Sequence, residues 1–255
     1  MENTNNNPLV CFFDSGIGGL SLLYECVRIL PRVDFTYFAD NYRMPYGSLT
    51  HEKMLEYVDE AFSFIAAQNP AATVVACNTV TAQCVNYLRQ KYKFNIVGIQ
   101  PAIKPAAARG GKCLVLATPS TAQSQSLNLL AERYGCGVTE IHACPDLAAY
   151  IENNIANLSE KEVQKLLPQI EADSVVLGCT HYVFIKEIIT DFYNCPVFDG
   201  IEGTAAHLAE ILGIFDHRAQ RGQKISFKGG DFTKNRVIFN RILVEKGHLS
   251  QNIEI

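Results

Sequence analysis

The chain reads Val74-Val75-Ala76-Cys77-Asn78-Thr79 in its first half and Val175-Val176-Leu177-Gly178-Cys179-Thr180-His181 in its second. In each segment a continuous apolar run, typical of a strand buried on both faces of a parallel sheet, ends at a cysteine that is closely followed by threonine. Open α/β sheets bind their ligands at the carboxyl ends of such strands. The two segments therefore predict an α/β fold in which one thiol from each half faces a common ligand.

Apolar runs and helix-length amphipathic stretches alternate along most of the chain, which favours mostly parallel sheets flanked by helices over a sandwich. The expected strands are Leu9–Phe13, Phe35–Ala39, Thr73–Ala76 and Asn95–Ile99, followed by Lys112–Ala117, Gly137–His142, Ser174–Leu177 and Pro196–Phe198. The expected helices include Leu20–Leu30, Lys53–Phe64 with Thr50 as its N-cap, and Glu202–Phe215. We interpret the pattern as two similar α/β domains with a cleft between them.

The segment from Gln100 to Gly111 separates the two sets of strands. Its prolines and its paired glycines are typical of a crossover into a second domain. A further strand over residues 224–228 and a closing helix over residues 232–246 follow, and their pattern alone does not assign them to either half. The predicted domains are residues 1–99 with about 208–255, and residues 100–207.

The composition favours a globular protein that acts on a small molecule. With 255 residues, of which 48% are hydrophobic, the chain can bury a sizeable core. Its polar start lacks the features of a signal peptide, and no long uncharged apolar segment is present, so we expect a cytoplasmic protein that does not engage membranes. A net charge of −4 gives no electrostatic reason to bind nucleic acid.

The cysteine and histidine spacing argues against disulfides and against a metal centre. The nine cysteines are odd in number and contain no C-x-x-C pair, which predicts mostly reduced, buried thiols. The histidines other than His181 lie too far apart for metal-ligand spacing. They are His51, His142, His207, His217 and His248. We therefore expect no metal.

Three turns at strand ends carry residues suited to anion binding. In Asp14-Ser15-Gly16-Ile17-Gly18-Gly19, glycines let backbone amides and a helix N-terminus approach a carboxylate, although a tight turn capped by Asp14 explains the segment equally well. Pro45-Tyr46-Gly47 is a rigid turn that can present backbone donors. The segment from Thr118 to Thr121 is either a second carboxylate cradle or an ordinary helix cap.

The two cysteine turns indicate acid–base or nucleophilic chemistry. Only a thiolate is a base or nucleophile, and an ordinary cysteine ionises near pH ~8.5. A buried structural thiol is the simpler interpretation of either cysteine alone, but equivalent turns in both halves favour function. His181 is the natural proton-transfer partner of Cys179. Its acidic companion could be Glu152, Asp173 or Asp146, and the pattern does not choose among them.

Four segments together resemble the glutamate racemase family in order, spacing and strand-end placement, over residues 9 to about 215. They are Phe12-Phe13-Asp14-Ser15-Gly16-Ile17-Gly18-Gly19-Leu20, Pro45-Tyr46-Gly47, Cys77-Asn78-Thr79 and Leu177-Gly178-Cys179-Thr180-His181-Tyr182. The resemblance implies a cofactor-independent racemase of two α/β domains that supplies D-glutamate for peptidoglycan. We also expect a homodimer.

The resemblance assigns a role to each matched residue. It makes Cys77 and Cys179 the acid–base thiols, with Asp14 assisting Cys77, His181 assisting Cys179, and Glu152 pairing with the histidine. The implied substrate contacts are Ser15, Pro45, Tyr46, Gly47, Asn78, Thr79, Thr121 and Thr180. The sequence departs from the family at Val183, where proline is usual, and at Gly200, where serine is common.

Other functions fit parts of the same pattern. Racemisation needs a base on one face of the substrate and an acid on the other, which two thiols supply. A racemase for aspartate or another amino acid would share the scaffold. A thiol-dependent decarboxylase or lyase would need only one protonating cysteine, and a two-lobed binding module would need neither.

Overall fold

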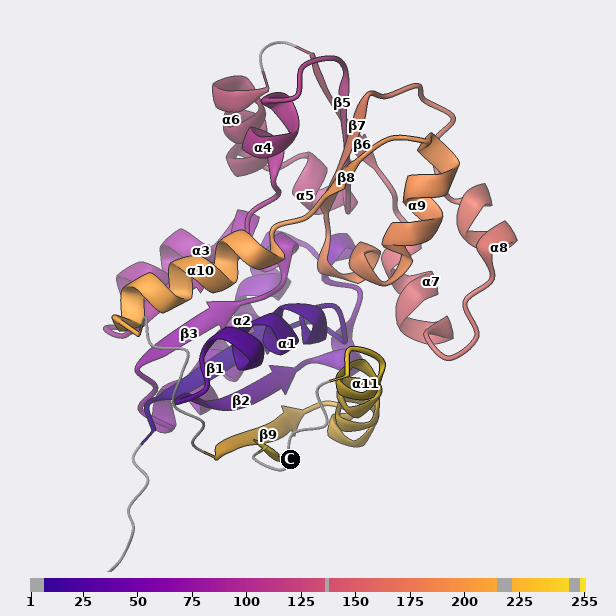
Figure 1. Cartoon of the computed structure of the whole chain (residues 1–255). Helices are drawn as coiled ribbons and strands as arrows, with labels where there is room; N and C mark the ends of the chain where they lie inside the picture. The colour runs from indigo at the N-terminus through magenta and orange to yellow at the C-terminus, as the bar shows by residue number, and fades with distance from the viewer. Residues whose placement is uncertain (1–6, 136–137, 215–221, 248–252) are drawn as a thin grey trace, which may run out of the picture.

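The computed structural model describes residues 7–135, 138–214, 222–247 and 253–255, and its strands form two parallel sheets (Figure 1). The six-stranded sheet has the order β10-β9-β2-β1-β3-β4, and the four-stranded sheet has the order β6-β5-β7-β8. The first sheet contains β1 (Leu9–Asp14), β2 (Asp34–Ala39), β3 (Ala72–Val75), β4 (Asn95–Gly98), β9 (Gln223–Gly229) and β10 (Ile253–Glu254). The second contains β5 (Cys113–Ala117), β6 (Thr139–Ala143), β7 (Ser174–Gly178) and β8 (Val197–Phe198). The predicted α/β fold with flanked parallel sheets is confirmed.

We call each sheet with its helices a lobe. The first lobe carries α1 (Leu20–Ile29), α2 (His51–Ala67), α3 (Asn78–Lys91), α10 (Ile201–Leu212) and α11 (Phe232–Glu245), with the short 3₁₀ helices η1 (Asn41–Arg43) and η2 (Tyr46–Ser48). The second carries α4 (Ile103–Ala107), α5 (Pro119–Ala122), α6 (Gln125–Tyr134), α7 (Leu147–Asn154), α8 (Glu160–Lys165), the 3₁₀ helix η3 (Thr180–Ile185) and α9 (Lys186–Tyr193). In Figure 1 the second lobe stands above the first.

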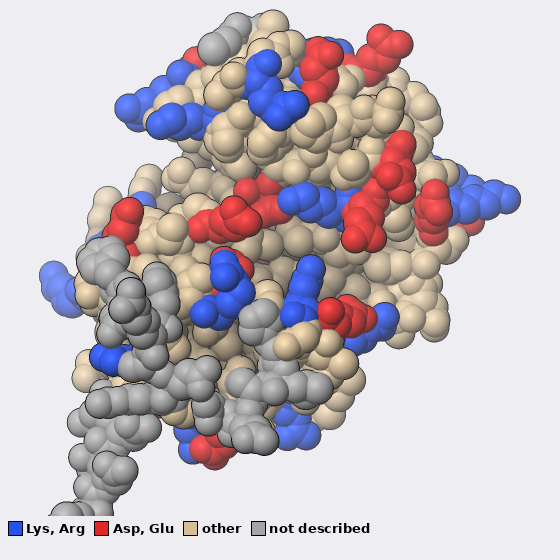
Figure 2. Space-filling view, viewed as in Figure 1, with Lys and Arg blue, Asp and Glu red and all other residues tan. Residues whose placement is uncertain are grey.

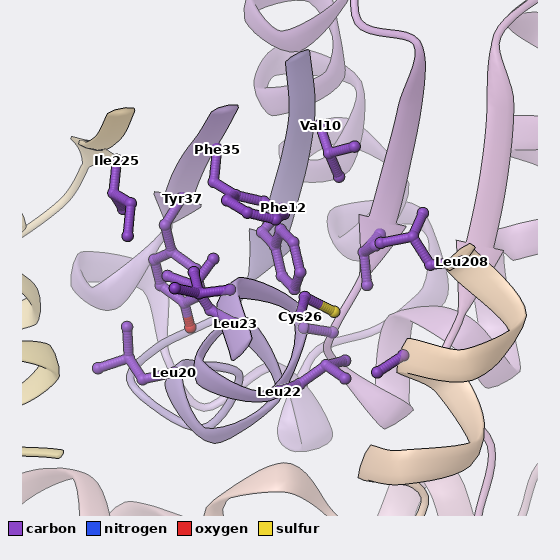
Figure 3. Close-up of a cluster of buried hydrophobic side chains, with 14 of the residues drawn as sticks. Val10, Phe12, Leu20, Leu22, Leu23, Cys26, Phe35, Tyr37, Leu208 and Ile225 are labelled. Atoms are coloured by element: carbon purple, nitrogen blue, oxygen red, sulfur yellow. The ribbon is translucent and has the colours of Figure 1, made fainter. Parts of the chain in front are cut away.

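The first sheet is covered on both faces, as its continuous apolar strands require. Alternate residues of β1 point to opposite faces, so Phe12 joins the core under α1, α10 and α11, whereas Cys11 and Phe13 join the core under α2 and α3. Figure 3 shows the first of these cores, where Phe12 meets Phe35 edge to face with ring centroids 5.9 Å apart. These layers fix where the strand ends lie.

The structure places two elements that the sequence pattern left unassigned. Strand β9 pairs with β2, with Phe35 beside Ile225, and α11 packs against α1. Both therefore belong to the first lobe. The predicted helix start at Thr50 also holds, because its hydroxyl accepts a hydrogen bond from the Lys53 amide at 3.3 Å.

The segment between the strand sets is not only a crossover, as predicted, because it also contains the short helix α4. Cys77 stands at the N-cap of α3 and Cys179 at the N-cap of the 3₁₀ helix η3, so each cysteine turn leads into a helix. Predictions that involve residues 1–6, Cys136, Gly137, Phe215, His217 and His248 lie outside the described residues.

The chain crosses between the lobes twice, after β4 and after β8, and the two crossings touch. Gly200 packs so closely on Gln100 that an added Cβ would collide with the Gln100 carbonyl oxygen. This contact accounts for glycine at a position where the resemblance leads one to expect serine.

The outer surface carries mixed charge. On the face shown in Figure 2, acidic and basic side chains alternate along the seam between the lobes, and neither sign forms a large patch there. Within the described parts of the chain, none of the helices combines the length and the apolar character needed to span a bilayer.

Gln223 gives a test of how the first lobe is held together. Its buried side-chain amide donates to the carbonyl oxygen of Leu30 at 2.8 Å, at the end of α1, and lies 3.3 Å from that of Val27. Gln223→Leu would remove this buried donor and leave the Leu30 carbonyl only its longer bond from the Val33 amide at 3.2 Å, so we expect the free energy of unfolding in urea to fall by about 1–3 kcal/mol. Lys228→Ala, on the exposed part of the same strand, is the control, and an equal loss in both variants would contradict this role.

Candidate active site

One cavity lies where the carboxyl ends of strands from both lobes meet. Its cavity volume is about 20 Å³, and both Cys77 and Cys179 line it. The other lining residues are Ser15, Met44, Pro45, Tyr46, Gly47, Asn78, Thr79, Thr118, Ala148, Thr180 and His181. Most of the predicted site residues line this cavity, and so does Thr118, from the turn predicted as a carboxylate cradle or a helix cap, whereas Met44 and Ala148 were not singled out from the sequence. Three predicted site residues, Asp14, Glu152 and Thr121, stand behind this lining.

Cys77 faces the cavity from the end of β3. Its Sγ lies 3.6 Å from Ser15 Oγ, and its side chain is almost fully buried. Burial, with the nearby charge of Asp14 adding to it, raises the pKa of the Cys77 thiol to about 12. In the closed cavity this thiol therefore rests as a proton donor.

Asp14 acts on Cys77 through Ser15. Asp14 Oδ1 accepts a hydrogen bond from the Ser15 amide at 2.6 Å, and the Ser15 hydroxyl, 3.4 Å from Oδ1, reaches the thiol. Asp14 Oδ2 accepts from the amide of Gly19, which is itself the N-cap residue of α1, so Asp14 closes the turn before the helix but is not its cap as the alternative interpretation predicted. Burial raises the pKa of Asp14, although the charge of His181 and the two amides oppose this rise.

The groups around Cys179 differ from those around Cys77. Its Sγ lies 3.9 Å from His181 Nδ1, and His181 Nε2 lies 2.8 Å from Glu152 Oε2. Among the acids that the sequence offered, the structure thus pairs Glu152 with the histidine. Asp173 instead accepts from the Lys112 amide at 2.7 Å, and Asp146 lies at the start of α7.

The Glu152–His181 pair is buried and charged. Burial lowers the pKa of His181, but its bonds to Cys179 and Glu152 outweigh this effect and raise the pKa to about 10. Burial raises the pKa of Glu152, but His181, the Ile17 amide and Lys234 together lower it to about 2. An imidazolium is therefore held next to Cys179, where it can stabilise a thiolate.

Glu152 belongs to the second lobe, but most of its donors come from the first. The Ile17 amide donates to Oε2 at 2.9 Å, whereas Asn41 Nδ2 and Lys234 Nζ donate to Oε1 at 2.8 and 2.9 Å. The sequence analysis missed Asn41 and Lys234. Asn41 follows the end of β2, so its strand-end position was a usable signal, whereas Lys234 had none.

Glycines of the β1–α1 turn make room for this pair. A Cβ at Gly18 would lie 2.6 Å from His181 Nδ1 and 2.9 Å from its backbone nitrogen, and a Cβ at Gly16 would collide with Glu152 Oε2. Both positions therefore require glycine, because a side chain would collide with the Glu152–His181 pair. From the sequence alone, these glycines indicated only that the turn has unusual conformational freedom.

Three threonine hydroxyls form a closed triangle at the cavity wall, with Thr79 and Thr118 in the lining and Thr121 behind them. Thr79 Oγ1 lies 3.0 Å from Thr118 Oγ1 and 3.2 Å from Thr121 Oγ1, and Thr118 and Thr121 are 2.9 Å apart. Thr79 comes from the first lobe and the other two from the second. Thr118 also caps α5, which confirms the helix-cap interpretation of that turn.

The Tyr46 side chain supports the wall and does not point into the cavity as a donor. Its hydroxyl donates to Asp40 Oδ2 at 2.7 Å, and its ring packs against Phe13. The Pro45–Gly47 turn therefore offers mainly backbone groups. Among the described residues, no group of three or more His, Cys, Asp or Glu side chains is arranged to hold a metal ion.

The Glu152–His181 pair predicts how stability depends on pH. Because the pKa of Glu152 is lowered from 4.5 toward 2, its contribution is present above pH 4.5 and is lost as the pH falls. Because the pKa of His181 is raised from 6.5 toward 10, its contribution is present below pH 6.5 and is lost as the pH rises.

We therefore expect the difference in unfolding free energy between wild type and Glu152→Gln to be largest between these two ordinary values. It should shrink on both sides by on the order of 2 kcal/mol. Urea unfolding at a series of pH values measures this difference, and a difference that does not change with pH would contradict the ion pair.

Comparisons with known proteins agree with this site. The family model described as Asp/Glu/Hydantoin racemase matches residues 36–208. The chain is 41% identical over 213 residues to a glutamate racemase of Clostridium novyi, covering 79% of this chain and 82% of that protein. It is 35% identical to glutamate racemase 2 of Bacillus subtilis, covering 85% and 86%.

Solved structures give the same result. A glutamate racemase from Escherichia coli, described in complex with L-glutamate and the activator UDP-MurNAc-ala, superposes with a TM-score of 0.78 at 26% identity, over 97% of each chain. A glutamate racemase isoform from Bacillus anthracis gives a TM-score of 0.76 at 27% identity, covering 97% and 96%.

Proposed function

Because the chain belongs to the Asp/Glu/hydantoin racemase family, we propose that it interconverts L- and D-glutamate by a two-base mechanism. The observation that carries this proposal is the placement of Cys77 and Cys179, one from each lobe, on the wall of one cavity. Similarity to curated glutamate racemases supports glutamate as the substrate.

Racemisation requires a proton to leave one face of the α-carbon and another to arrive on the opposite face. A single fixed base cannot do both. In the proposed reaction one cysteine thiolate removes the α-proton, the facing thiol donates its own proton to the carbanion, and the two sulfurs end with their protonation states exchanged. The next turnover with the opposite enantiomer then restores the first state.

The two thiols would be prepared differently. Cys179 lies 3.9 Å from the His181 imidazole, which is paired with Glu152, whereas Cys77 lies beside the Ser15 hydroxyl and has its pKa raised to about 12, which suits a resting donor. When Cys77 is the base, Asp14 would assist it by orienting Ser15, whose hydroxyl contacts the sulfur. When Cys179 is the base, Glu152 would assist it by orienting His181, whose imidazole contacts that sulfur.

The carbanion would be stabilised by polar groups around the cavity. The substrate carboxylates would be held by the Thr79 and Thr180 hydroxyls, the Asn78 side chain, Ser15 and the turn amides at Gly47, all of which line the cavity. Preorganised donors that point at developing charge are typically worth ~3–4 kcal/mol each in a site closed to water. Thr121, which does not line the cavity, would hold the Thr79 hydroxyl in place through their hydrogen bond.

The biological role follows from the product. We infer that the protein supplies D-glutamate for peptidoglycan, and so supports cell-wall synthesis and cell shape, from the cytoplasm. Its partner would be the small-molecule substrate, with neither nucleic acid nor membrane involved and with a homodimer as the working form.

Replacement of either thiol tests the two-base mechanism. We expect Cys77→Ser and Cys179→Ser each to lower glutamate racemisation by at least about 10²–10⁴-fold, because each loses a positioned acid–base group. Circular dichroism follows the change in optical activity, and the far-ultraviolet spectrum checks the fold. Cys195→Ser, a partly exposed thiol away from the cavity, is the control.

Full turnover in both directions by either single variant would refute the mechanism. Incubation of wild type with separate L-amino acids decides the substrate, because activity on aspartate and not on glutamate would support the related aspartate enzyme. Release of carbon dioxide without racemisation would indicate a decarboxylase, and ligand binding without α-proton exchange in D₂O would indicate a binding module.

His181→Asn tests whether the histidine serves Cys179 alone. The two enantiomers have equal free energies, so kcat/KM must fall by the same factor in both directions. The α-deuterium isotope effects on kcat/KM need not change equally. They should rise for the enantiomer whose proton Cys179 removes and fall for the other, because the step at Cys179 now limits both directions. Equal effects for the two enantiomers would count against the assignment.

A further inference from the structure

We propose that Lys234 of α11 is a positioning residue for Cys179, acting through Glu152 and His181, so that the chain of groups behind this thiol is complete only when α11 of the first lobe lies against α7 of the second. This inference rests on the proposed racemisation. It concerns a residue that contacts neither the substrate cavity nor either thiol.

The geometry is that of a two-point contact. Lys234 Nζ donates to Glu152 Oε1 at 2.9 Å and to the Glu152 backbone carbonyl oxygen at 2.8 Å. The same ammonium thus holds both the side chain and the main chain of Glu152, close to the carboxyl end of α7, where a cation is also favoured by the helix dipole. With Oε1 held by Lys234 and Asn41, Oε2 is turned toward His181.

The charge arrangement gives this contact a functional consequence. The Glu152 side chain is only 5% exposed, so its negative charge is screened little by water. Lys234 is 31% exposed and brings a positive charge to Glu152 Oε1, whereas His181 is bound to Glu152 Oε2. It therefore draws part of the carboxylate charge away from the imidazole and moderates how tightly His181 holds its proton.

Lys234 differs from the surface cations of the same helix. Arg241, two turns further along α11, pairs with Glu245 on the same helix at 2.7 Å, and both side chains are more than half exposed. Such a pair contributes little. Lys234 instead joins the two lobes, so its replacement should affect proton transfer at the Cys179 sulfur.

The kinetic test compares Lys234→Met with His181→Asn. We expect kcat/KM of Lys234→Met to fall on the order of tenfold, as when other residues that orient a ligand-binding side chain are replaced. The α-deuterium isotope effects should rise and fall for the same enantiomers as in His181→Asn. Lys234→Arg should restore wild-type behaviour, since it keeps the charge and the donors, and Arg241→Met is the matched control.

A second measurement does not depend on activity. The charged or titratable groups around His181 are Cys179 on its own turn, Glu152 on α7 and Asp14 on β1, with Lys234 behind Glu152. NMR titration of the His181 imidazole, assigned with His181→Asn, should show a higher pKa in Lys234→Met, because Glu152 then directs more negative charge to the ring. Lys234→Arg should return the pKa to the wild-type value. Lys234→Gln, which removes the charge but keeps a donor, is the alternative if the methionine variant does not fold.

The outcomes separate the two proposals. Loss of stability or of kcat/KM in Lys234→Met, with isotope effects and His181 titration both unchanged, would overturn the positioning role and leave an ordinary interlobe ion pair. If wild type fails to racemise glutamate, the proposed function is wrong. The His181 titration then decides alone, since an unshifted pKa overturns the action of Lys234 and a raised one supports it.

Discussion

A buried carboxylate that cannot be satisfied within its own lobe dominates this structure. Glu152 lies on α7 of the second lobe, but the Ile17 amide, Asn41 and Lys234 that hydrogen-bond to it all belong to the first. His181 of its own lobe bonds only to Oε2, so the donors to Oε1 are in place only while the lobes stay in register, and a buried carboxylate oxygen without a donor is costly. His181 and, through it, Cys179 depend on this register.

The same constraint explains why the two halves are chemically unequal although they share a turn. On the first side, the strand end presents Cys77 to a hydroxyl, and the nearby carboxylate of Asp14 is engaged by backbone amides. On the second side, the strand end presents Cys179 to an imidazole backed by an ion pair. Identical thiols therefore receive different assistance, from a hydroxyl on one side and from a charged pair on the other.

Local signals in the sequence were enough to predict the parallel sheets, the cysteine turns and the glycine-rich turn after β1, because each depends on strand periodicity or on residues close in sequence. The acid that pairs with His181 could be narrowed only to three candidates from spacing, and the resemblance selected Glu152. Asn41 and Lys234 could not be predicted, because they lie 111 and 82 residues from Glu152 and meet it only through packing of the lobes. The placement of β9 beside β2 was hidden for the same reason.

The contact between Gly200 and Gln100 has a mechanical meaning. Two covalent connections that touch define a single line, and the only large relative motion of the lobes that strains neither connection is a rotation about that line. The lobes can therefore part at the cavity while the two connections keep their length. An opening of this kind, wide enough to admit an amino acid, preserves the alignment of the two sulfurs along the rotation axis, so that closing returns each thiol to its own face of the α-carbon.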